Sequence, residues 1–206
     1  MSIVTIAADS VAPQAWRNGG GQTRELLAWP TPSDWALRIS RADIGADGPF
    51  SEFAGVQRWF AVLHGAGVRL RFAHTVTTLQ AGDAPLQFDG ASAPLCELVG
   101  GPTQDLNLMV RGGRGVMQAV QEAAPWHAHC SMRGMYAVAA GVWSDGEQTQ
   151  ALPAHTLLWC ETPADRPWTF SPRAAQTAPT ANDAAHSGAY APAIAFWLGF
   201  TPETPP

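Results

Sequence analysis

The sequence predicts an all-β protein that is built from many short strands. Its 206 residues include 20 glycines and 17 prolines, which indicates many turns. Residues 35–41, 68–72 and 106–110 alternate apolar and polar side chains, which is the pattern of strands with one buried face. Residues 58–63 and 136–140 are more continuously apolar and predict fully buried strands. Turn signals recur about every ten residues, and this spacing is typical of a β-sandwich or barrel.

Three later segments complete the predicted order of elements. Residues 116–122 are the best candidate for a helix, which would be short. Residues 171–190 are rich in Ala, Pro, Thr and Asn with almost no large apolar side chain, so we expect a flexible surface loop there. Residues 193–200 (AIAFWLGF) predict a buried strand that closes the fold.

A weak internal repeat indicates how these strands are divided. Residues 58–65 (RWFAVLHG) lead through a predicted hairpin to the turn LQAGD at 79–83. Residues 134–141 (GMYAVAAG) lead in the same way to LPAHT at 152–156. Two such blocks fit a duplicated small barrel, with chance similarity as the alternative. We therefore predict an N-terminal barrel over residues 1–115 and a C-terminal, mainly structural barrel over residues 116–206.

The charged residues exclude several classes of function. The net charge of −5 disfavours a nucleic-acid-binding surface, which needs clustered positive charge. All 12 basic residues are arginine, so Schiff-base chemistry and a phosphate-loop lysine are excluded. The planar arginine side chain suits recognition of a carboxylate or phosphate. A compositional bias of the source genome explains the arginines equally well.

No segment predicts targeting to a membrane or insertion into it. The first residues lack a basic start followed by an apolar run, and no run approaches the roughly 18 apolar residues of a membrane span. Cys96, Cys130 and Cys160 are widely spaced and form no C-x-x-C pair, which favours free thiols in a reducing compartment. We therefore expect a cytoplasmic protein, and we leave open whether it forms a homodimer.

The most unusual segment is WRNGGGQTREL at residues 16–26. Gly19, Gly20 and Gly21 allow backbone conformations that other residues avoid, and they let a ligand approach the main chain closely. One interpretation is that their N–H groups and Asn18 surround a polar ligand. The other interpretation is a β-bulge or hairpin turn without a ligand.

Three predicted strands carry polar side chains on a single face. These side chains are Thr23 and Glu25 on the first strand, Arg38 and Ser40 on the second, and Asp105, Asn107 and Arg111 on the third, where Met109 shares their face. Alternating polar positions usually form a wet outer surface, but they can also line a barrel that holds one small ligand. Between these strands, DGPFSEFAG at residues 47–55 predicts a structured turn whose aromatic rings plug a barrel end.

These motifs together resemble the HutD family, which includes the Ves proteins. The resemblance rests on WRNGGGQTRE at 16–25, LRISRA at 37–42, DGPFSEFAGVQR at 47–58 and DLNLMVR at 105–111. It extends over roughly residues 3–120 and is weaker in the second half. It implies a cupin-like double-stranded β-helix (jelly roll) with two cupin-like half-barrels, that is, a bicupin. It also implies an accessory or regulatory protein of histidine utilisation, with a small carboxylate such as N-formylglutamate as its ligand.

The sequence gives little support for a metal or for catalysis. His127 and His129 form the His-x-His pair that many cupins use, but no carboxylate follows them and the pair lies in a connection between the halves. No G-x-S-x-G turn is present. Glu25 and Asp105 would form an acid–base pair only if both line one cavity. We therefore expect no catalytic residues, no metal and no cofactor.

The sequence thus favours a non-catalytic protein that binds a small polar anionic metabolite. The predicted ligand-binding residues are Asn18, Gly19, Gly20, Gly21, Thr23, Glu25, Arg38, Ser40, Asn107 and Arg111. One alternative is a cupin-type enzyme, either metal-free through Glu25 or with a metal at His127 and His129. Another is an interaction module with an empty barrel and an exposed apolar surface on its nine tryptophans.

Overall fold

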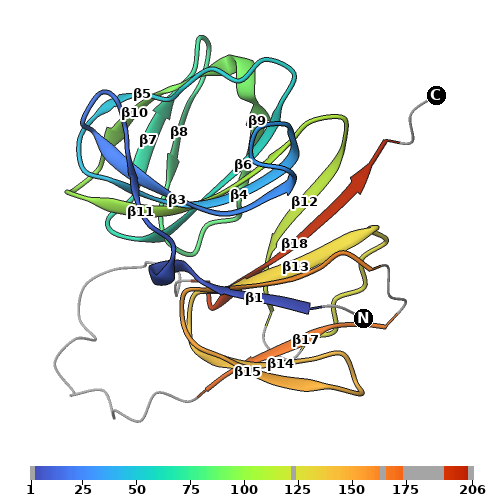
Figure 1. Ribbon diagram of the computed structural model, residues 1–206. Helices are drawn as coiled ribbons and strands as arrows, with labels where there is room; N and C mark the ends of the chain where they lie inside the picture. The colour runs from blue at the N-terminus through green and yellow to red at the C-terminus, as the bar shows by residue number, and fades with distance from the viewer. Residues whose placement is uncertain (1–2, 122–123, 163–165, 174–192, 204–206) are drawn as a thin grey trace, which may run out of the picture.

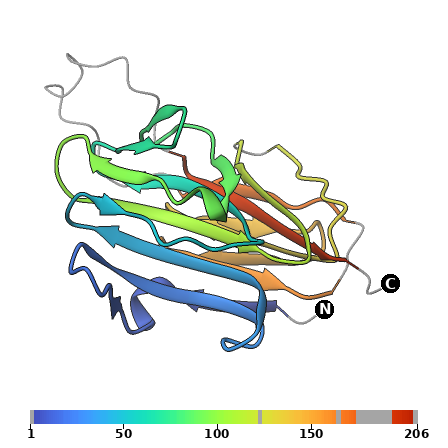
Figure 2. The same cartoon turned by 90° about the horizontal axis from the view of Figure 1, so that it is seen from above.

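The computed structural model describes residues 3–121, 124–162, 166–173 and 193–203, and it is all-β over these ranges (Figure 1). The chain forms two barrels, and each pairs a large sheet with a small one. The N-terminal barrel lies above the C-terminal barrel in Figure 1, and Figure 2 shows the same molecule from above. The described residues contain no α-helix, only the short 3-10 turns η1 (Ala8–Ser10) and η2 (Gly90–Ser92). None of these described helices is long and apolar enough to span a membrane.

The N-terminal barrel consists of a six-stranded and a four-stranded sheet. The strands of the large sheet are β2 (Gln14–Ala15), β3 (Gly21–Pro30), β4 (Trp35–Ile44), β6 (Gln57–His64), β9 (Leu86–Asp89) and β11 (Thr103–Val110). Their order is β2-β3-β4-β11-β6-β9. The small sheet contains β5 (Gly48–Pro49), β7 (Val68–Arg71), β8 (Val76–Leu79) and β10 (Leu95–Leu98) in the order β5-β10-β7-β8.

The C-terminal barrel repeats this plan. Its large sheet contains β1 (Ile3–Ala7), β12 (Gly113–Ala119), β13 (Met132–Ala137), β16 (Thr156–Cys160) and β18 (Ala195–Pro202) in the order β1-β16-β13-β18-β12. Its small sheet contains β14 (Gly141–Ser144), β15 (Thr149–Leu152) and β17 (Thr169–Pro172) in the order β15-β14-β17. The pairings of β6 with β11, and of β7 with β8 and β10, recur as β13 with β18 and as β14 with β15 and β17. The same connectivity in both halves is what a duplicated barrel requires.

The ends of the two barrels are interleaved along the chain. The first strand, β1, pairs antiparallel with β16 and therefore extends the C-terminal large sheet. The strand β12 pairs with β18 from Gly113 onward, so residues 113–115 also hydrogen-bond within that sheet. Strand pairing thus places residues 3–7 and 113–115 with the second half of the chain.

The predicted helix at residues 116–122 is wrong where the structure describes it. Residues 116–119 belong to β12, which forms an edge of the large sheet, and Val120 donates its N–H to the carbonyl of Ala195. Pairing along β18 satisfies the backbone of this segment, and tertiary context of this kind outweighs a weak helical preference. Of the predicted loop at 171–190, Ser171 and Pro172 lie in β17, and residues 174–190 lie outside the described residues.

The two large sheets pack back to back around the largest apolar cluster. One set of its side chains comes from β4, β6 and β11, namely Leu37, Ile39, Trp59, Ala61, Leu63, Leu106, Leu108 and Val110. The other set includes Met117, Met132, Tyr136, Leu157, Trp159, Phe196, Leu198 and Phe200 from the C-terminal barrel. The alternation predicted for residues 35–41 and 106–110 therefore buries Leu and Ile residues between the barrels. The opposite face of β4 and β11 points into the N-terminal barrel.

The tryptophans are buried or half-buried and do not form a surface patch. Trp59, Trp126, Trp143, Trp159, Trp168 and Trp197 are buried, and Trp16, Trp29 and Trp35 are half-buried. The large apolar side chains that the described part of the chain exposes are valines and a leucine. The interaction module that the sequence left open therefore loses its proposed tryptophan surface.

We expect the interface between the barrels to dominate stability. Leu108 is fully buried in this cluster, so Leu108→Ala should lower the free energy of unfolding by about 2–5 kcal/mol. Leu95→Ala makes the same change at an exposed position and should cost less than about 0.5 kcal/mol. Urea denaturation followed by tryptophan fluorescence measures both values, and equal losses would contradict the role of the interface.

Candidate ligand-binding site

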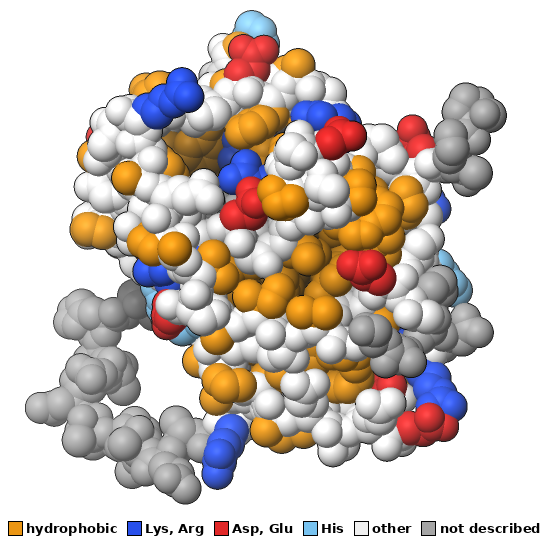
Figure 3. Space-filling model, in the orientation of Figure 1, with side chains coloured by type: hydrophobic (Ala, Val, Ile, Leu, Met, Phe, Trp, Pro, Cys, Tyr) orange, Lys and Arg blue, Asp and Glu red, His pale blue; other side chains and the backbone are white. Residues whose placement is uncertain are grey.

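A cavity of about 790 Å³ opens into the N-terminal barrel. Its wall is the inner face of β3, β4, β6 and β11, and its mouth lies between residues 14–18 and residues 49–53. Figure 3 shows a recess on this barrel in which apolar and basic side chains lie together. The volume falls within the range of about 300–1,000 Å³ that is typical of sites for small molecules.

Strand register places the polar side chains of the wall in layers. Met109 on β11 lies between Arg38 on β4 and Arg58 on β6. Two residues along β11, Asn107 lies beside Ser40, and the next layer contains Asp105. Beyond this layer, an apolar cluster of seven buried residues that includes Phe60, Val62 and Cys96 fills the small-sheet side of the barrel.

Arg58 is a buried cation that aromatic rings surround. Its side chain is among the buried residues at 6% exposure, and its guanidinium lies 5.1 Å from the ring centre of Phe50, 5.7 Å from Phe53 and 5.0 Å from Phe88. Cation–π attraction to these ring faces offsets part of the cost of burying the charge. Burial lowers the pKa of Arg58 to about 10, so the side chain remains a cation at neutral pH.

Asn107 connects this cation to a buried acid. The Nη2 group of Arg58 donates to Oδ1 of Asn107 at 3.0 Å, and Nδ2 of Asn107 donates to Oδ1 of Asp105 at 2.5 Å. Burial raises the pKa of Asp105 well above its usual range, although Arg58 and Asn107 act in the opposite direction. The side chain of Asp105 therefore favours its neutral, protonated form.

A second arginine lies at the same depth as Arg58 but is paired. Nε of Arg38 lies 2.7 Å from Oε2 of Glu25, and both side chains are about one-fifth exposed. Glu25 comes from β3, next to the β-bulge between Glu25 and Leu27. The pair holds the Arg38 guanidinium at the cavity wall, where it also repels the Arg58 cation.

The mouth of the cavity is formed by the turn that contains the three glycines. Nε1 of Trp16 donates to Oγ1 of Thr23 at 2.7 Å, which fixes the indole at the opening. Gly19 has φ of +71°, and a Cβ on Gly21 would lie 2.4 Å from the carbonyl oxygen of Asp43. The N–H of Gly20 donates to Oδ1 of Asn18 at 3.0 Å. The glycines therefore meet the needs of a tight turn that packs against β4.

The structure brings together only part of the predicted set. Five predicted residues line the cavity, namely Asn18, Thr23, Arg38, Ser40 and Asn107. Glu25 reaches the cavity through its ion pair with Arg38. Gly19, Gly20 and Gly21 are outside the lining and shape the turn that carries Asn18. Arg111 is also outside the lining, because β11 ends at Val110 and the exposed guanidinium stacks 4.9 Å from the ring centre of Trp35.

Several lining residues were missing from the predicted set. These are Gln14, Ala15, Trp16, Arg17, Ala42, Ile44, Pro49, Phe50, Ser51, Phe53, Arg58, Asp105 and Met109. For Arg58 a signal existed, because a lone arginine in the apolar run of β6 shares the face of Phe60 and Val62. The aromatic residues of 47–55 were expected to plug a barrel end; Phe50 and Phe53 lie against Arg58 in the lining of the cavity.

The C-terminal barrel has a different interior. Trp126, Trp143, Trp168 and Trp197 pack with Phe170 and smaller side chains in one buried cluster. Arg133 is buried among them, with its guanidinium 4.3 Å from the ring centre of Trp168. Outside this barrel's core, His127 and His129 are exposed. In the part of the chain that the structure describes, no three His, Cys, Asp or Glu side chains gather as metal ligands would.

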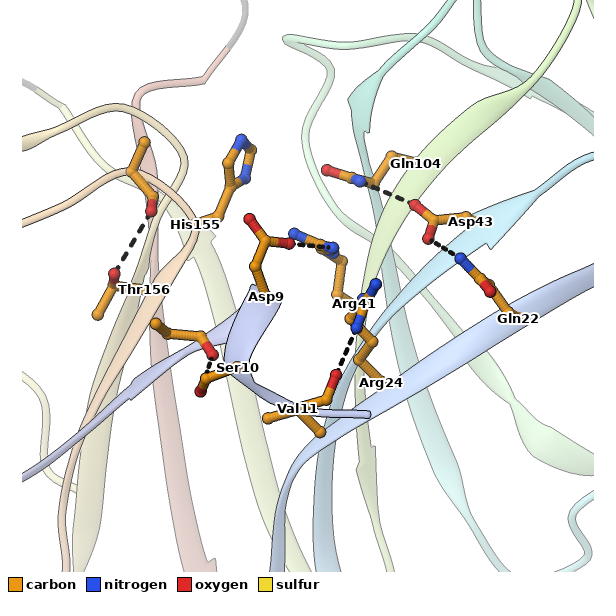
Figure 4. A network of polar contacts seen from close by, with 12 residues as sticks. Asp9, Ser10, Val11, Gln22, Arg24, Arg41, Asp43, Gln104, His155 and Thr156 are labelled. Carbon is orange, nitrogen blue, oxygen red and sulfur yellow. Dashed lines mark hydrogen bonds and ion pairs between the residues drawn. The ribbon is translucent and has the colours of Figure 1, made fainter. Parts of the chain in front are cut away.

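A separate polar network joins the two barrels (Figure 4). Arg41 on β4 pairs with Asp9 in η1 at 2.8 Å, and Arg24 on β3 donates to the carbonyl of Val11. Asp43 accepts hydrogen bonds from Gln22 and Gln104 at 3.0 and 2.8 Å. These residues fix the segment by which the chain passes from β1 into the N-terminal barrel.

Comparison with known proteins places the chain among bacterial proteins of one family. The sequence pattern of the HutD family matches residues 8–179. Protein Ves of Citrobacter koseri is 33% identical over 135 residues, which are 65% of this chain and 71% of that protein. An uncharacterised 21.2 kDa protein in the hutC 3′ region of Pseudomonas putida is 40% identical over 97 residues, 46% of this chain and 50% of that protein.

Solved structures confirm the predicted cupin fold. HutD from Pseudomonas fluorescens SBW25 has a TM-score of 0.78 and 25% identity, covering 97% of this chain and 98% of its own. A conserved protein of unknown function from Pseudomonas aeruginosa PAO1 has a TM-score of 0.79 and 27% identity, covering 98% and 99%. An oxalate decarboxylase from Lactobacillus farciminis, 10% identical at a TM-score of 0.60 over 98% of this chain and 87% of its own, shares the fold alone.

Replacing Asp105 by asparagine tests its protonation state through stability. Because its folded-state pKa is raised, the folded protein binds more protons than the unfolded chain, and stability falls as pH rises from the unfolded value of about 3.9 to the folded one. Asp105→Asn should therefore gain stability relative to the wild type as pH rises, by up to about 1.4 kcal/mol for each pH unit in that window. Urea denaturation at pH 4.5, 6 and 8 measures the difference.

Asp43→Asn is the matched control with the opposite sign. Although burial opposes its charged form, hydrogen bonds from Gln104 and Gln22 lower the pKa of Asp43 below its usual value. The carboxylate therefore stabilises the fold above the unfolded pKa, and this contribution is lost as pH falls through the folded pKa. Asp43→Asn should be less stable than the wild type at pH 7, with a gap that narrows in acid. The same sign for both variants would contradict the assignment of a neutral Asp105.

Proposed function

Because the chain belongs to the HutD family, we propose that it is a cytoplasmic, non-catalytic binding protein for a small carboxylate such as N-formylglutamate. We further propose an accessory or regulatory role in histidine utilisation. The observation that carries the binding proposal is the convergence of Arg38 and Arg58 on one layer of a polar cavity. The link to histidine utilisation is supported by the relative described as lying in the hutC 3′ region of Pseudomonas putida.

The charge of the cavity supports an anionic ligand. Its lining contains three arginines, Arg17, Arg38 and Arg58, and one carboxyl group, Asp105. Since the pKa of Asp105 is raised by burial, this acid does not cancel the positive charge of the arginines. A guanidinium forms short, charge-assisted hydrogen bonds with a carboxylate, and these are stronger where water is excluded.

The free donors in the wall indicate where such a ligand binds. In the described residues Nε of Arg58 has no hydrogen-bond partner, and its Nη1 lies 3.5 Å from the carbonyl oxygen of Ser51. A buried donor without a partner costs roughly 1–3 kcal/mol, which a bound oxygen would recover. Ser40, Thr23 and Asn18 add neutral polar groups nearer the mouth, suited to the polar remainder of a small metabolite.

Calorimetry with N-formylglutamate, glutamate, urocanate and formate tests the proposal. We expect at least one of these carboxylates to bind at one site per chain, with affinity that falls as salt is added because the attraction is electrostatic. Proton NMR of the same mixtures over a day should show no conversion of the ligand. If none of the four binds, the proposed function is wrong, and conversion would instead favour an enzyme.

Replacing Arg58 by methionine should weaken binding of the best carboxylate by roughly 10- to 100-fold, since a hydrogen bond to a charged group contributes about 1.5–3 kcal/mol. The methionine keeps an apolar side chain among Phe50, Phe53 and Phe88. Arg69→Met is the matched control, because Arg69 is exposed and contacts Glu97. Circular dichroism and thermal unfolding verify that both variants fold. Equal affinities of the two variants would exclude Arg58 as the anchor of the ligand.

A further inference from the structure

Asp105 is a buried acid of the cavity lining, and one of its carboxyl oxygens has no hydrogen-bond partner among the described residues. Its side chain is 1% exposed, and it belongs to the cavity lining. Oδ1 accepts a hydrogen bond from Nδ2 of Asn107, whereas Oδ2 has no hydrogen-bond partner among the described residues. The anion recognition described above uses arginines and leaves this acid without a role.

The orientation of Asn107 determines which oxygen of Asp105 carries the proton. Because Oδ1 of Asn107 accepts from Arg58, its Nδ2 must point toward Asp105. That N–H group donates to Oδ1 of Asp105, and an oxygen that already accepts a hydrogen bond is the poorer place for a proton. The proton of the neutral acid therefore belongs on Oδ2, the oxygen that has no partner among the described residues.

Burial raises the pKa of Asp105 and favours its neutral form in the absence of a ligand, and the surrounding charges modify this effect. Arg58 on β6 favours the carboxylate, but the Asn107 amide separates the two side chains, and they form no direct ion pair among the described residues. Asp43 on β4 disfavours a second negative charge, and the thiol of Cys96 on β10 is also nearby. Among the described residues no histidine lines the cavity, and Asp105 is the carboxylic acid of the lining.

We propose that Asp105 acts as a neutral hydrogen-bond donor to the ligand, with its Oδ2–H directed at an oxygen of the carboxylate that Arg58 binds. This inference rests on the proposed function and adds a specificity-determining residue to it. The site then binds an anion while Asp105 is protonated. It selects a ligand with one oxygen at the Arg58 guanidinium and another that extends past the Asn107 amide to Asp105. An anion that offers no such acceptor leaves Oδ2–H unpaired, as it is in the free protein.

Proton linkage follows from this arrangement. A carboxylate at Oδ2 strengthens the hold on the proton, and a deprotonated Asp105 repels the same carboxylate. Affinity should therefore be constant on the acid side of the Asp105 titration and fall about tenfold for each pH unit on its alkaline side. Binding on the alkaline side should take up one proton. The carboxylates of N-formylglutamate titrate near pH 3–4.5 and stay charged throughout this range.

Calorimetry of N-formylglutamate from pH 5.5 to 9, in buffers of different ionisation enthalpy, measures the affinity and the proton uptake together. The range stops at 9 because the pKa of Arg58 is about 10. Asp105→Asn presents an amide whose oxygen accepts from Asn107 and whose NH₂ replaces the Oδ2–H donor. This variant should bind within about threefold of the wild-type value in acid and should lose the dependence on pH.

Asp105→Leu and Asp43→Asn complete the test. Asp105→Leu fills the position without a donor, and its affinity should not depend on the Asp105 titration. It should bind about 10- to 100-fold more weakly than the wild type does on the acid side, since a bond to a charged ligand is lost. Asp43 lies outside the cavity lining but disfavours a negative charge on Asp105, so Asp43→Asn should keep the fall in affinity at alkaline pH and shift it to lower pH.

Two results overturn the role of Asp105 alone. One is an Asp105→Asn variant that still loses affinity at alkaline pH, and the other is Asp105→Asn binding as weakly as Asp105→Leu. If the wild type binds none of the four carboxylates, the proposed function fails, and the role of Asp105 fails with it. Thermal unfolding of each variant verifies that a loss of binding is not a loss of fold.

Discussion

The apolar contact between the two large sheets determines which side chains of β4 and β11 point into the N-terminal barrel. Leu37 and Ile39 on β4, and Leu106, Leu108 and Val110 on β11, are buried against the C-terminal barrel. Because side chains alternate between the two faces of a strand, the residues between these apolar positions point into the interior of their own barrel. A barrel with apolar residues on its outside and polar residues on its inside is therefore a consequence of its partner. In a protein with a single barrel, the same alternation would predict strands whose polar face lies in water.

The polar interior of the N-terminal barrel costs stability, and the proposed ligand would recover part of that cost. Arg58 and Asp105 are both buried, and each keeps an atom without a partner among the described residues. A half-satisfied buried network is worse for stability than an apolar core of the same volume. Asn107 lessens this cost by bonding to both groups at once, while leaving Arg58 Nε and Asp105 Oδ2 unpaired. Natural proteins retain such groups where a ligand completes them.

The sequence predicted the fold and the faces of β4 and β11 well, because these depend on local periodicity. Arg38, Ser40 and Asn107 line the cavity for the same reason. Arg58 was missed because β6 is buried on both faces, so its run carries little alternation to separate the cavity face from the interface.

Other errors came from contacts that no local pattern encodes. The role of the glycines depends on the approach of β3 to Asp43 of β4, which is distant in sequence. The strand assignment of residues 116–119 depends on pairing with β18, about eighty residues away along the chain. The exclusion of Arg111 depends on where β11 ends, and boundaries of elements are weakly marked in a sequence.

Because the two barrels have the same connectivity, equivalent positions can be compared to find the residues that differ between the hollow barrel and the filled one. Arg58 and Arg133 are each the second residue of equivalent strands, β6 and β13, and each guanidinium lies against aromatic rings. On the neighbouring strands β11 and β18, Asn107 pairs with Phe60 of β6, and Trp197 pairs with Met135 of β13. Two residues away in each strand, Asp105 in the first barrel corresponds to Ala195 in the second.

A buried arginine and its aromatic partners are thus common to both barrels, so their contacts contribute to the packing of the fold as well as to the proposed site. What distinguishes the N-terminal barrel is the amide and the acid beside the arginine, where the C-terminal barrel has an indole and a methyl group. Trp197 packs against Trp126 and Trp168 and fills the space that a ligand would need. The chemistry of the hollow barrel therefore resides in Asn107 and Asp105 on β11, and Arg58 supplies the charge on which they act.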